Sequence, residues 1–367
     1  MDTTDPEIRF DEKGVSNHCH EFDSLYNHEW FPNEKGKNIL NDFLKKIKKE
    51  GRGNKYNCII GLSGGIDSSY LAIKVKEFGL KPLVVHVDAG WNSELAVNNI
   101  EKIIKYCNYD LHTHVVNWKD MRSLHLSYLK SGIANQDVPQ DHIFFSSLYH
   151  FAIKNKIKYI ISGGNLATEG VFPPTWHGSA MDSINLKAIH KKFGNTPLKS
   201  YKTISFFQYY FWYPIILGMR TIRPLNYMEY NKENALKELE KIGYKPYPKK
   251  HGESIFTKFF QNYYLPKKFG YDKRLPHYSS LILSNQMTRK EAIELLKEPL
   301  YDKTELQNDI DYIIKKLQID NKDFEYIMNC DKSYYEDYPN WLKLQSFIKK
   351  IQNIYSKIFK KKLKVYS

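Results

Sequence analysis

Residues 56–70 read YNCIIGLSGGIDSSY, and this stretch decides the fold expected of the chain. Its first part, Cys58 to Ile60, is a short apolar run typical of a buried parallel strand. A glycine turn follows, and from Tyr70 onward the apolar residues have helical spacing. A helix N-terminus presents unpaired N–H groups and the positive end of its dipole, so it binds anions. The stretch therefore predicts a strand, a phosphate-binding turn and a helix.

The turn lacks two common nucleotide motifs. No Walker A string is present, and Gly61 and Gly64 have the wrong spacing for a dinucleotide fingerprint. What remains is SGGxDS, which resembles the PP-loop of the ATP pyrophosphatase superfamily, whose members cleave ATP between its α and β phosphates. A turn that only caps a helix is the weaker alternative, because strand, motif and helix are in register. The candidate ATP-binding residues are Gly61, Ser63, Gly64, Gly65, Asp67, Ser68 and Ser69.

The rest of the chain predicts an α/β fold with a doubly wound, mostly parallel sheet. The expected strands are 58–60, 83–87, 111–116, 158–162 and 222–225. The expected regions are an irregular N-terminal segment plus a helix (1–54), the PP-loop α/β domain (55–245) and a helical C-terminal region (246–367).

Polar residues follow the second expected strand, at Asp88, Trp91 and Asn92. Ligands of open α/β sheets bind at the carboxyl ends of strands, so these residues are expected beside the glycine turn. Asp88 is a candidate for magnesium or the ribose of ATP, and a simple turn residue is an equal alternative. Trp91 and Asn92 are candidate substrate contacts.

A second glycine turn follows the strand at 158–162 and reads GGNLATEG. Its Gly-Asn-x-x-x-Glu pattern resembles the metal-binding segment of ammonia-using NAD synthetases, which are also PP-loop enzymes. Gly163 and Asn165 are candidate ATP contacts. Glu169 and Asp67 are candidate ligands of the Mg²⁺ that neutralises pyrophosphate, and with Ser63 they form the expected catalytic set. The alternative is a glycine turn followed by a surface glutamate.

Three further segments have a distinctive composition. Residues 171–215 are aromatic and interrupted by prolines, as in an insertion that covers the sheet end as a substrate lid. Asp141, which precedes an expected helix, is interpreted as its cap.

The tail from Trp341 to Ser367 has the pattern of a basic amphipathic helix. Such a helix packs on other helices or lies at a membrane surface. Lysines and arginine lie among aromatics in 256–274, and the candidate phosphate or substrate contacts are Lys258, Lys267, Lys268, Lys273 and Arg274.

Composition limits the class of protein. The net charge of +14 suits polyanions, and nucleotides and sugar nucleotides are anions as well as nucleic acids. The four cysteines are scattered without a CxxC pair, which indicates a reducing, cytoplasmic compartment. No apolar run is long enough for a membrane span, and the acidic start MDTTDPEIRF is not a signal peptide.

Several segments together resemble the N-acetyl sugar amidotransferase family of WbpG-like and PseA-like proteins. They are MDTTDPEIRFDEKGV (1–15), GLSGGIDSSYLA (61–72), VHVDAGWNSELAVNNI (85–100), ISGGNLATEG (161–170) and FTKFFQNYYLPKKFGYDKR (256–274). The resemblance implies an enzyme that uses ATP and Mg²⁺ to convert an acetamido group of a nucleotide-linked or nonulosonic sugar into an acetamidino group. It further implies release of AMP and pyrophosphate and a place in surface-polysaccharide (LPS O-antigen) or flagellin glycan biosynthesis.

The chain departs from this family at its start. Relatives have a CxxC before the region that matches Asp2, and a second pair of the form GVCxxC. Here Ser16 stands where the third cysteine is expected and only Cys19 remains. If relatives bind zinc there, this chain as given is expected not to, whether it begins late, is truncated or has lost the site.

The ammonia must come from elsewhere. Met1 is followed by Asp2 rather than a cysteine nucleophile, and no cysteine lies in a glycine-flanked elbow. The hypothesis is a separate glutaminase, resembling the histidine-pathway synthase pair, with a cyclase-like subunit. The first rival is a tRNA-modifying PP-loop enzyme that adenylates a nucleobase; the basic charge favours it and the missing catalytic cysteine pair argues against it. The second is a non-catalytic nucleotide-binding module, which a complete SGGxDS argues against.

Overall fold

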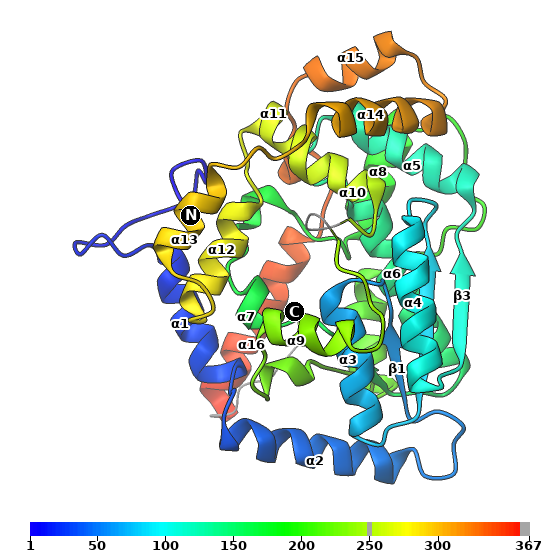
Figure 1. Ribbon diagram of the computed structural model, residues 1–367, viewed down its shortest axis with the longest axis vertical. Helices are drawn as coiled ribbons and strands as arrows, with labels where there is room; N and C mark the ends of the chain where they lie inside the picture. The colour runs from blue at the N-terminus through cyan, green and yellow to red at the C-terminus, as the bar shows by residue number, and fades with distance from the viewer. Residues whose placement is uncertain (248–251, 360–367) are drawn as a thin grey trace.

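The computed structural model describes residues 1–247 and 252–359, with side chains up to residue 350 (Figure 1). A five-stranded parallel sheet lies at its centre, in the order β3-β2-β1-β4-β5. The first four expected strands are present, so the predicted doubly wound parallel α/β fold is confirmed. The fifth, expected at 222–225, is corrected to Arg220–Ile222, because a 3₁₀ turn begins at Pro224. The strands are β1 (Cys58–Gly61), β2 (Pro82–Asp88), β3 (Leu111–Val115), β4 (Tyr159–Ile161) and β5 (Arg220–Ile222).

β1 is the strand at which the order of strand addition reverses. Ile59 pairs with Leu83 of β2 on one side and with Ile160 of β4 on the other. The chain winds outward from β1 first through β2 and β3 and then through β4 and β5. In open α/β sheets, ligands bind outside the carboxyl ends of the strands at such a switch point. The glycine turn directly after β1 occupies this position.

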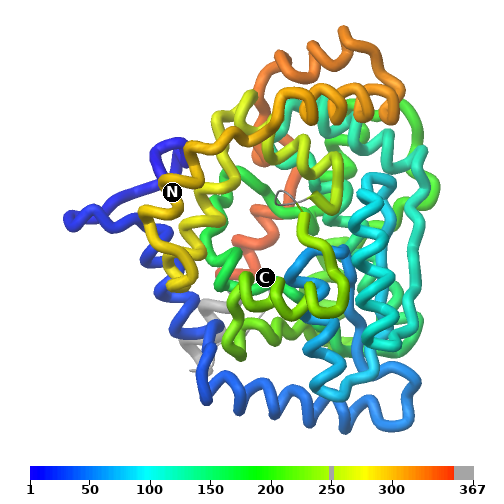
Figure 2. The backbone as a smooth tube through the Cα atoms, viewed as in Figure 1, coloured from blue at the N-terminus to red at the C-terminus, as the bar shows by residue number. Residues whose placement is uncertain are grey.

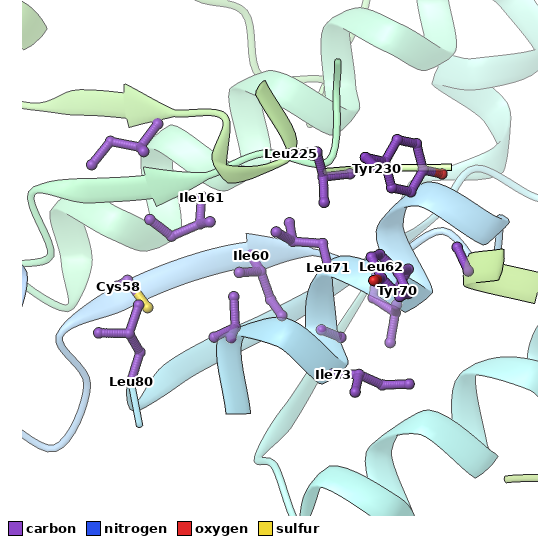
Figure 3. Packing of buried hydrophobic residues seen from close by; sticks show 14 of the residues in the cluster. Cys58, Ile60, Leu62, Tyr70, Leu71, Ile73, Leu80, Ile161, Leu225 and Tyr230 are labelled. Atoms are coloured by element: carbon purple, nitrogen blue, oxygen red, sulfur yellow. The ribbon is translucent and has the colours of Figure 1, made fainter. Parts of the chain in front are cut away.

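Alternate residues of β1 supply two cores, one on each face of the sheet. Cys58 and Ile60 are buried on one face, and Figure 3 shows them pointing toward Leu80 and toward Leu71 of helix α3. Ile59 is buried in the core on the opposite face. The helices of the first face are α2 (Glu34–Glu50), α3 (Ile66–Glu77), α4 (Glu94–Cys107) and α9 (Lys232–Glu240). Those of the second are α5 (Trp118–Ser131), α6 (Val138–Lys154) and α8 (Ser183–Phe193).

The segment 171–215 was expected to be a lid over the sheet end, and most of it is not. It contains the short 3₁₀ turn η1 (Pro174–Trp176), α8 and the π-helix η2 (Gln208–Ile216). Leu186 and Ile189, which lie on one face of α8, are fully buried where this helix packs on α5 and α6. This part of the segment therefore belongs to the core on the second face of the sheet.

The N-terminal segment expected to be irregular contains the helix α1 (Asn17–Glu29). Ser16 caps it by accepting a hydrogen bond from the Cys19 amide, and Phe22 is buried. The helix was not predicted because turn-forming residues lie on either side of it in the sequence. Figure 2 shows the first residues beside the yellow helices, where the Met1 amino group donates to Ser279 Oγ at 2.6 Å.

The region after residue 252 is helical, as expected, and the domain boundaries remain predictions. Figure 1 shows α14 and α15 beyond α5 and α10, and α12 and α13 near α1. The basic tail forms α16, and its last residues, 360–367, lie outside the described part of the chain. None of the described helices combines the length and apolarity needed to cross a bilayer. The elements are α10 (Ile255–Phe259), η4 (Phe260–Tyr264), α11 (Leu265–Phe269), α12 (Arg274–Leu283), α13 (Arg289–Leu296), α14 (Lys303–Leu317), α15 (Asn321–Asn329), η5 (Tyr335–Asp337) and α16 (Leu342–Phe359).

Candidate functional site

The turn after β1 is held in shape by its own hydroxyl groups. Ser63 Oγ and Ser68 Oγ lie 3.0 Å apart, and Ser68 Oγ also donates to the Gly65 carbonyl at 3.1 Å. The amides of Ser63 and Gly65 donate to Ser68 Oγ and Ser63 Oγ, each at 3.3 Å. These bonds fix the loop ahead of α3 before any ligand binds. Ser69, by contrast, is fully buried, so its hydroxyl is not presented to a ligand.

Gly64 is the residue on which the shape of this turn depends. Its φ is +87°, and a Cβ at this position would lie 3.0 Å from the Ala96 carbonyl oxygen. The phenols of Tyr244 and Tyr247 both donate to the Gly64 carbonyl, at 2.9 and 3.0 Å. The segment after α9 therefore clamps the turn from outside.

Asp67 connects the two glycine turns. Asn165 Nδ2 lies 3.5 Å from Asp67 Oδ1, and a Cβ on Gly163 would be 3.1 Å from the Asp67 carbonyl oxygen. The Tyr230 hydroxyl also donates to Asp67 Oδ1. Burial and the negative charges of Asp67 and Glu169 raise the pKa of the Tyr230 phenol, so it stays protonated as a donor. The structure thus brings Asp67, Gly163 and Asn165 together, with Glu169 nearby.

Glu169 ends the short helix α7 (Leu166–Glu169), which Asn165 caps by accepting from the Thr168 amide at 3.0 Å. A Cβ on Gly164 would lie 3.6 Å from Glu169 Oε2 and 3.8 Å from Arg223 Nε. Both charged groups therefore face the second glycine turn. Arg223 follows β5 directly and is a cation that the sequence reasoning missed, although its position after the last expected strand was a usable signal.

The residues present suit a magnesium ion that is shared with phosphates. Within the described residues there is no group of three His, Cys, Asp or Glu side chains that could hold a metal. Mg²⁺ keeps several waters and needs only one or two carboxylates besides substrate phosphates. Asn165 links the two carboxylates, because its Nδ2 lies 3.5 Å from Asp67 Oδ1 and it caps the short helix that ends at Glu169. They fit this role, and an all-protein metal cage is not expected.

Asp88 and Asn92 lie at the neighbouring strand end. Asp88 Oδ1 accepts from the Gly90 amide at 2.8 Å, which is the turn-forming alternative. Asn92 Nδ2 donates to His86 Nε2 at 2.9 Å, and His86 Nδ1 donates to the Leu62 carbonyl at 2.8 Å. Asn92 therefore supports the residue before the PP-loop through His86.

Trp91 does not line the site. It is 1% exposed and packs against Trp118 and Phe256. Its indole N–H donates to His125 Nε2 at 3.0 Å. The expected substrate contact is therefore corrected to a core residue that joins the sheet end to α5 and α10, because the apolar faces of these helices close over it.

Two of the expected phosphate contacts are engaged inside the C-terminal region. Lys258 Nζ pairs with Glu305 at 2.7 Å and Asp309 at 2.6 Å. Lys268 is buried, and its ammonium donates to the Cys330 carbonyl at 2.7 Å. These lysines hold α10 and α11 to α14 and α15, so the structure does not place them at the phosphate turn.

Arg274 is engaged within the C-terminal region, and Lys267 stays a predicted contact. Arg274 makes a bidentate pair with Asp272, with N–O distances from 2.8 to 3.1 Å, and donates to the Glu298 carbonyl at 2.8 Å. Lys267 is exposed, with its ammonium 5.9 Å from the Tyr263 ring centroid. The carboxylate partner of Arg274 is two residues away, whereas the Glu298 carbonyl lies 24 residues along the chain, where the local basic–aromatic pattern could not reveal it.

Lys273 has a different environment. Its ammonium lies 2.8 Å from His177 Nε2, and the His177 ring stacks on Phe172 with centroids 3.7 Å apart. Burial and the neighbouring ammonium lower the pKa of His177 well below its usual value, so the neutral imidazole accepts the hydrogen bond.

The positive charge of Lys273 acts on two carboxyl groups, those of Asp137 and Asp141. Asp137 is 7% exposed and accepts from Thr257 Oγ1 at 3.1 Å and Gln140 Nε2 at 2.9 Å. Burial raises the pKa of both carboxyl groups, and the charge of Asp141 adds to the shift at Asp137. We call Asp137, Asp141, His177 and Lys273 the carboxylate–lysine cluster.

Asp141 was interpreted as a helix cap, but it lies in the first turn of α6. Among the described residues, no hydrogen bond to its carboxylate is found, and the side chain keeps partial exposure. The usable signal was the polar run NQDVPQD, which sets like charges four residues apart inside an otherwise apolar segment.

The start of α6, which carries Asp137 and Asp141, lies at the same edge of the sheet as the SGGIDS turn. α6 packs on β1, β2 and β4 and ends just before β4 begins, so its N-terminus lies at the carboxyl edge of the strands. The charge of Glu169 raises the pKa of Asp141 and of Tyr230, and Tyr230 contacts Asp67. The charge of Glu169 therefore acts both on Tyr230, the partner of Asp67, and on the cluster.

Comparison with protein families identifies the C-terminal region. Residues 253–352 match the family model described as "LPS biosynthesis protein WbpG-like, C-terminal domain". This region is similar to the C-terminal domain of WbpG-like proteins. The predicted resemblance to WbpG-like proteins is thereby confirmed. The WbpG-like domain joins the sheet edge at its first residues, where the Ser93 amide donates to the Glu253 carbonyl and the Ile255 amide to the Trp91 carbonyl, at 2.9 and 3.0 Å.

Other similarities are partial. An uncharacterised protein of Methanocaldococcus jannaschii is 40% identical over 80 residues, which is 21% of this chain and 28% of that protein. The chain thus matches little more than a quarter of that relative. NMN synthetase from Francisella tularensis aligns with a TM-score of 0.38 and 14% identity, over 72% of this chain and 97% of that one. NH3-dependent NAD synthetase from Campylobacter jejuni aligns with a TM-score of 0.33 and 11% identity, over 81% and 98%. Neither structural likeness is strong enough to support an activity.

Proposed function

We propose that the chain is an ATP-dependent amidotransferase that acts on an acetamido group of a nucleotide-activated or nonulosonic sugar. It adenylates the amide oxygen and replaces it with ammonia to give an acetamidino sugar, AMP and pyrophosphate. The observation that carries the proposal is a preformed SGGIDS turn at the sheet's switch point, on the same edge as a cluster built partly by the WbpG-like domain. The description of the matching family, an LPS biosynthesis protein, supports a role in surface-polysaccharide biosynthesis.

The first step activates an amide, which is a poor electrophile because its nitrogen donates into the carbonyl. The amide oxygen attacks the α-phosphorus, the bond to pyrophosphate breaks, and the amide nitrogen loses its proton. The hydroxyls of Ser63 and Ser68 and the N-terminus of α3 would hold the departing pyrophosphate. A bound Mg²⁺ would neutralise phosphate charge when held by Asp67 and Glu169, and Arg223 would add a fixed positive charge.

The second step is attack by ammonia on the adenylated carbon. A C–N bond forms, the C–O bond to AMP breaks, and a proton must leave the attacking nitrogen. Asp141 is suited to accept it, because its carboxylate receives no hydrogen bond within the described residues and lies on the PP-loop side. A buried carboxyl group whose pKa is raised toward neutrality is an effective base at that pH.

The nitrogen source in this proposal is a separate glutaminase subunit, with a cyclase-like subunit beside it. Burial raises the pKa of the Cys58 thiol, and that of Cys107 to about 11, so neither forms the thiolate that a glutaminase needs. We expect the purified chain to use ammonium and not glutamine. Equal use of both by the isolated chain would overturn the partner proposal.

The decisive test is product analysis by mass spectrometry. The protein is mixed with ATP, Mg²⁺, ammonium and a panel of UDP- and CMP-linked diacetamido sugars. AMP together with exchange of one sugar oxygen for NH supports the proposal and names the substrate. Intact ATP across the panel contradicts it, and AMP formed only with tRNA would support the rival tRNA-modifying enzyme.

A further inference from the structure

The π-helix η2 and its N-cap residue Phe207, counted with it below, expose a concentrated set of apolar side chains. They are Phe207, Phe211, Trp212, Ile215 and Ile216, with exposed fractions from 37 to 62%. The same helix is anchored by Tyr213, which is 2% exposed and stacks on Tyr149. The fold therefore fixes η2 through Tyr213 and leaves these five side chains largely exposed. A patch of this kind on a folded chain usually marks an interaction site.

The start of α16 extends this patch. Gln345 Nε2 donates to the Tyr210 hydroxyl at 2.9 Å, and buried Trp341 packs against Phe206 and Tyr210. Next to these contacts α16 exposes Leu342, Leu344 and Phe347, with Phe347 at 63%. We call the exposed apolar residues of η2 and of α16 up to residue 350, together, the η2–α16 face.

Positive charge is concentrated in the segments that carry this face. Residues 183–219 contain five lysines and residues 338–350 contain three, and neither segment contains an aspartate or glutamate. These two segments are joined by the hydrogen bond between Gln345 and Tyr210. They therefore carry eight positive charges and no negative charge of a chain whose net charge is +14.

We propose that the η2–α16 face docks the protein on an anionic membrane surface. Exposed Trp, Phe and Ile side chains would enter the headgroup boundary while the surrounding lysines contact anionic lipids, the combination that characterises interfacial elements. A two-fold contact between copies would set each lysine-rich segment against its own like charges, which disfavours self-association. This inference is independent of the proposed reaction.

The test is co-sedimentation of the full chain with lipid vesicles. We expect binding to vesicles of mixed phosphatidylcholine and phosphatidylglycerol at low salt, at least tenfold weaker binding to pure phosphatidylcholine, and weakening as salt rises. Replacement of both Trp212→Ser and Ile216→Ser should reduce binding at least tenfold. The matched control is Ile293→Ser, an apolar residue on α13 that is 48% exposed and lies outside the face.

Three results would overturn the proposal. One is no binding to either kind of vesicle. Another is equal loss of binding by the Ile293→Ser control. The third is a concentration-dependent dimer that the Trp212→Ser and Ile216→Ser changes dissolve, because the face would then hold a second copy. Circular dichroism of each variant separates lost binding from lost folding, and the exposed positions make retained folding the expected result.

Discussion

The phosphate turn and the carboxylate–lysine cluster lie at one edge of the sheet and are built in opposite ways. The turn is made by consecutive residues whose own hydroxyls close it, as in the 3.0 Å contact between Ser63 and Ser68. The cluster is assembled from the start of α6, the segment around His177 and the residues before α12. A motif of consecutive residues can be recognised in the sequence, and its shape depends little on the rest of the chain. A cluster built from distant segments forms only when the chain folds, and its residues can change without altering the turn.

The largest expected effect tests the turn side of this comparison. Asp67→Asn keeps the acceptor for Tyr230 and Asn165 but removes the carboxylate charge, so folding should be preserved. We expect both pyrophosphate exchange and amidine formation to fall by about 1,000-fold, because charge stabilisation of the departing pyrophosphate is lost. The measurement is radiolabelled pyrophosphate exchange into ATP beside product analysis.

The matched control is Asp88→Asn at the neighbouring strand end, where the amide oxygen can still accept from Gly90. Near-wild-type activity of this variant shows that the loss belongs to Asp67. An Asp67→Asn enzyme with unchanged exchange would remove Asp67 from the reaction.

How much the sequence could predict follows the same division. The strands and the SGGxDS turn were found because each is a short contiguous pattern. Lys258 was misplaced because its partners Glu305 and Asp309 lie on α14. The cluster was missed because Thr257, which bonds Asp137, is 120 residues away from it. No local pattern encodes contacts between such distant segments.

The second prediction tests the cluster side, and it assumes the proposed reaction. Asp141→Asn removes the proton acceptor but leaves the phosphate turn intact. We expect amidine formation to fall by about 100-fold while pyrophosphate exchange in the presence of sugar stays near wild type. A rise in the KM for ammonium or a shifted pH profile would distinguish a catalytic role from a structural one.

The split between the two assays decides the outcome. Loss of exchange as well as amidination in Asp141→Asn would show that the cluster serves the first step. Absence of exchange in the wild-type protein would instead contradict the proposed function itself.

The third prediction measures how rigid the turn is. Gly64→Ala places a Cβ 3.0 Å from the Ala96 carbonyl oxygen at a φ of +87°. We expect a loss of about 2 kcal/mol in the free energy of unfolding, from backbone strain and the close contact together. Urea unfolding gives this value.

The matched control is Gly53→Ala, which has a φ of +85° and no atom within 4 Å of the added Cβ. It should cost only the strain of the left-handed conformation, about 1 kcal/mol. Equal losses in the two variants would mean that the atoms around Gly64 move to accommodate the added Cβ, so the close contact with the Ala96 carbonyl oxygen costs nothing.

The smallest expected effect is on the free energy of unfolding, which the carboxyl pair Asp137 and Asp141 should lower at high pH. The direction follows from the sign of the pKa shifts. Burial raises the pKa of Asp137 and Asp141 in the folded chain above that of the unfolded chain, near 3.8. Above about pH 4 the folded state therefore binds more protons than the unfolded state. Because of this difference, the free energy of unfolding should fall as the pH rises. We expect Asp141→Asn to be more stable than wild type by about 1 kcal/mol at pH 8 and to differ less at pH 4. Urea unfolding at both pH values tests this, with Asp88→Asn as the control that should follow the wild-type curve. A wild type that gains stability over Asp141→Asn as the pH rises would show that Lys273 stabilises the ionised carboxylate more than burial destabilises it, and the cluster would then be an ion pair rather than a reserve of proton acceptors.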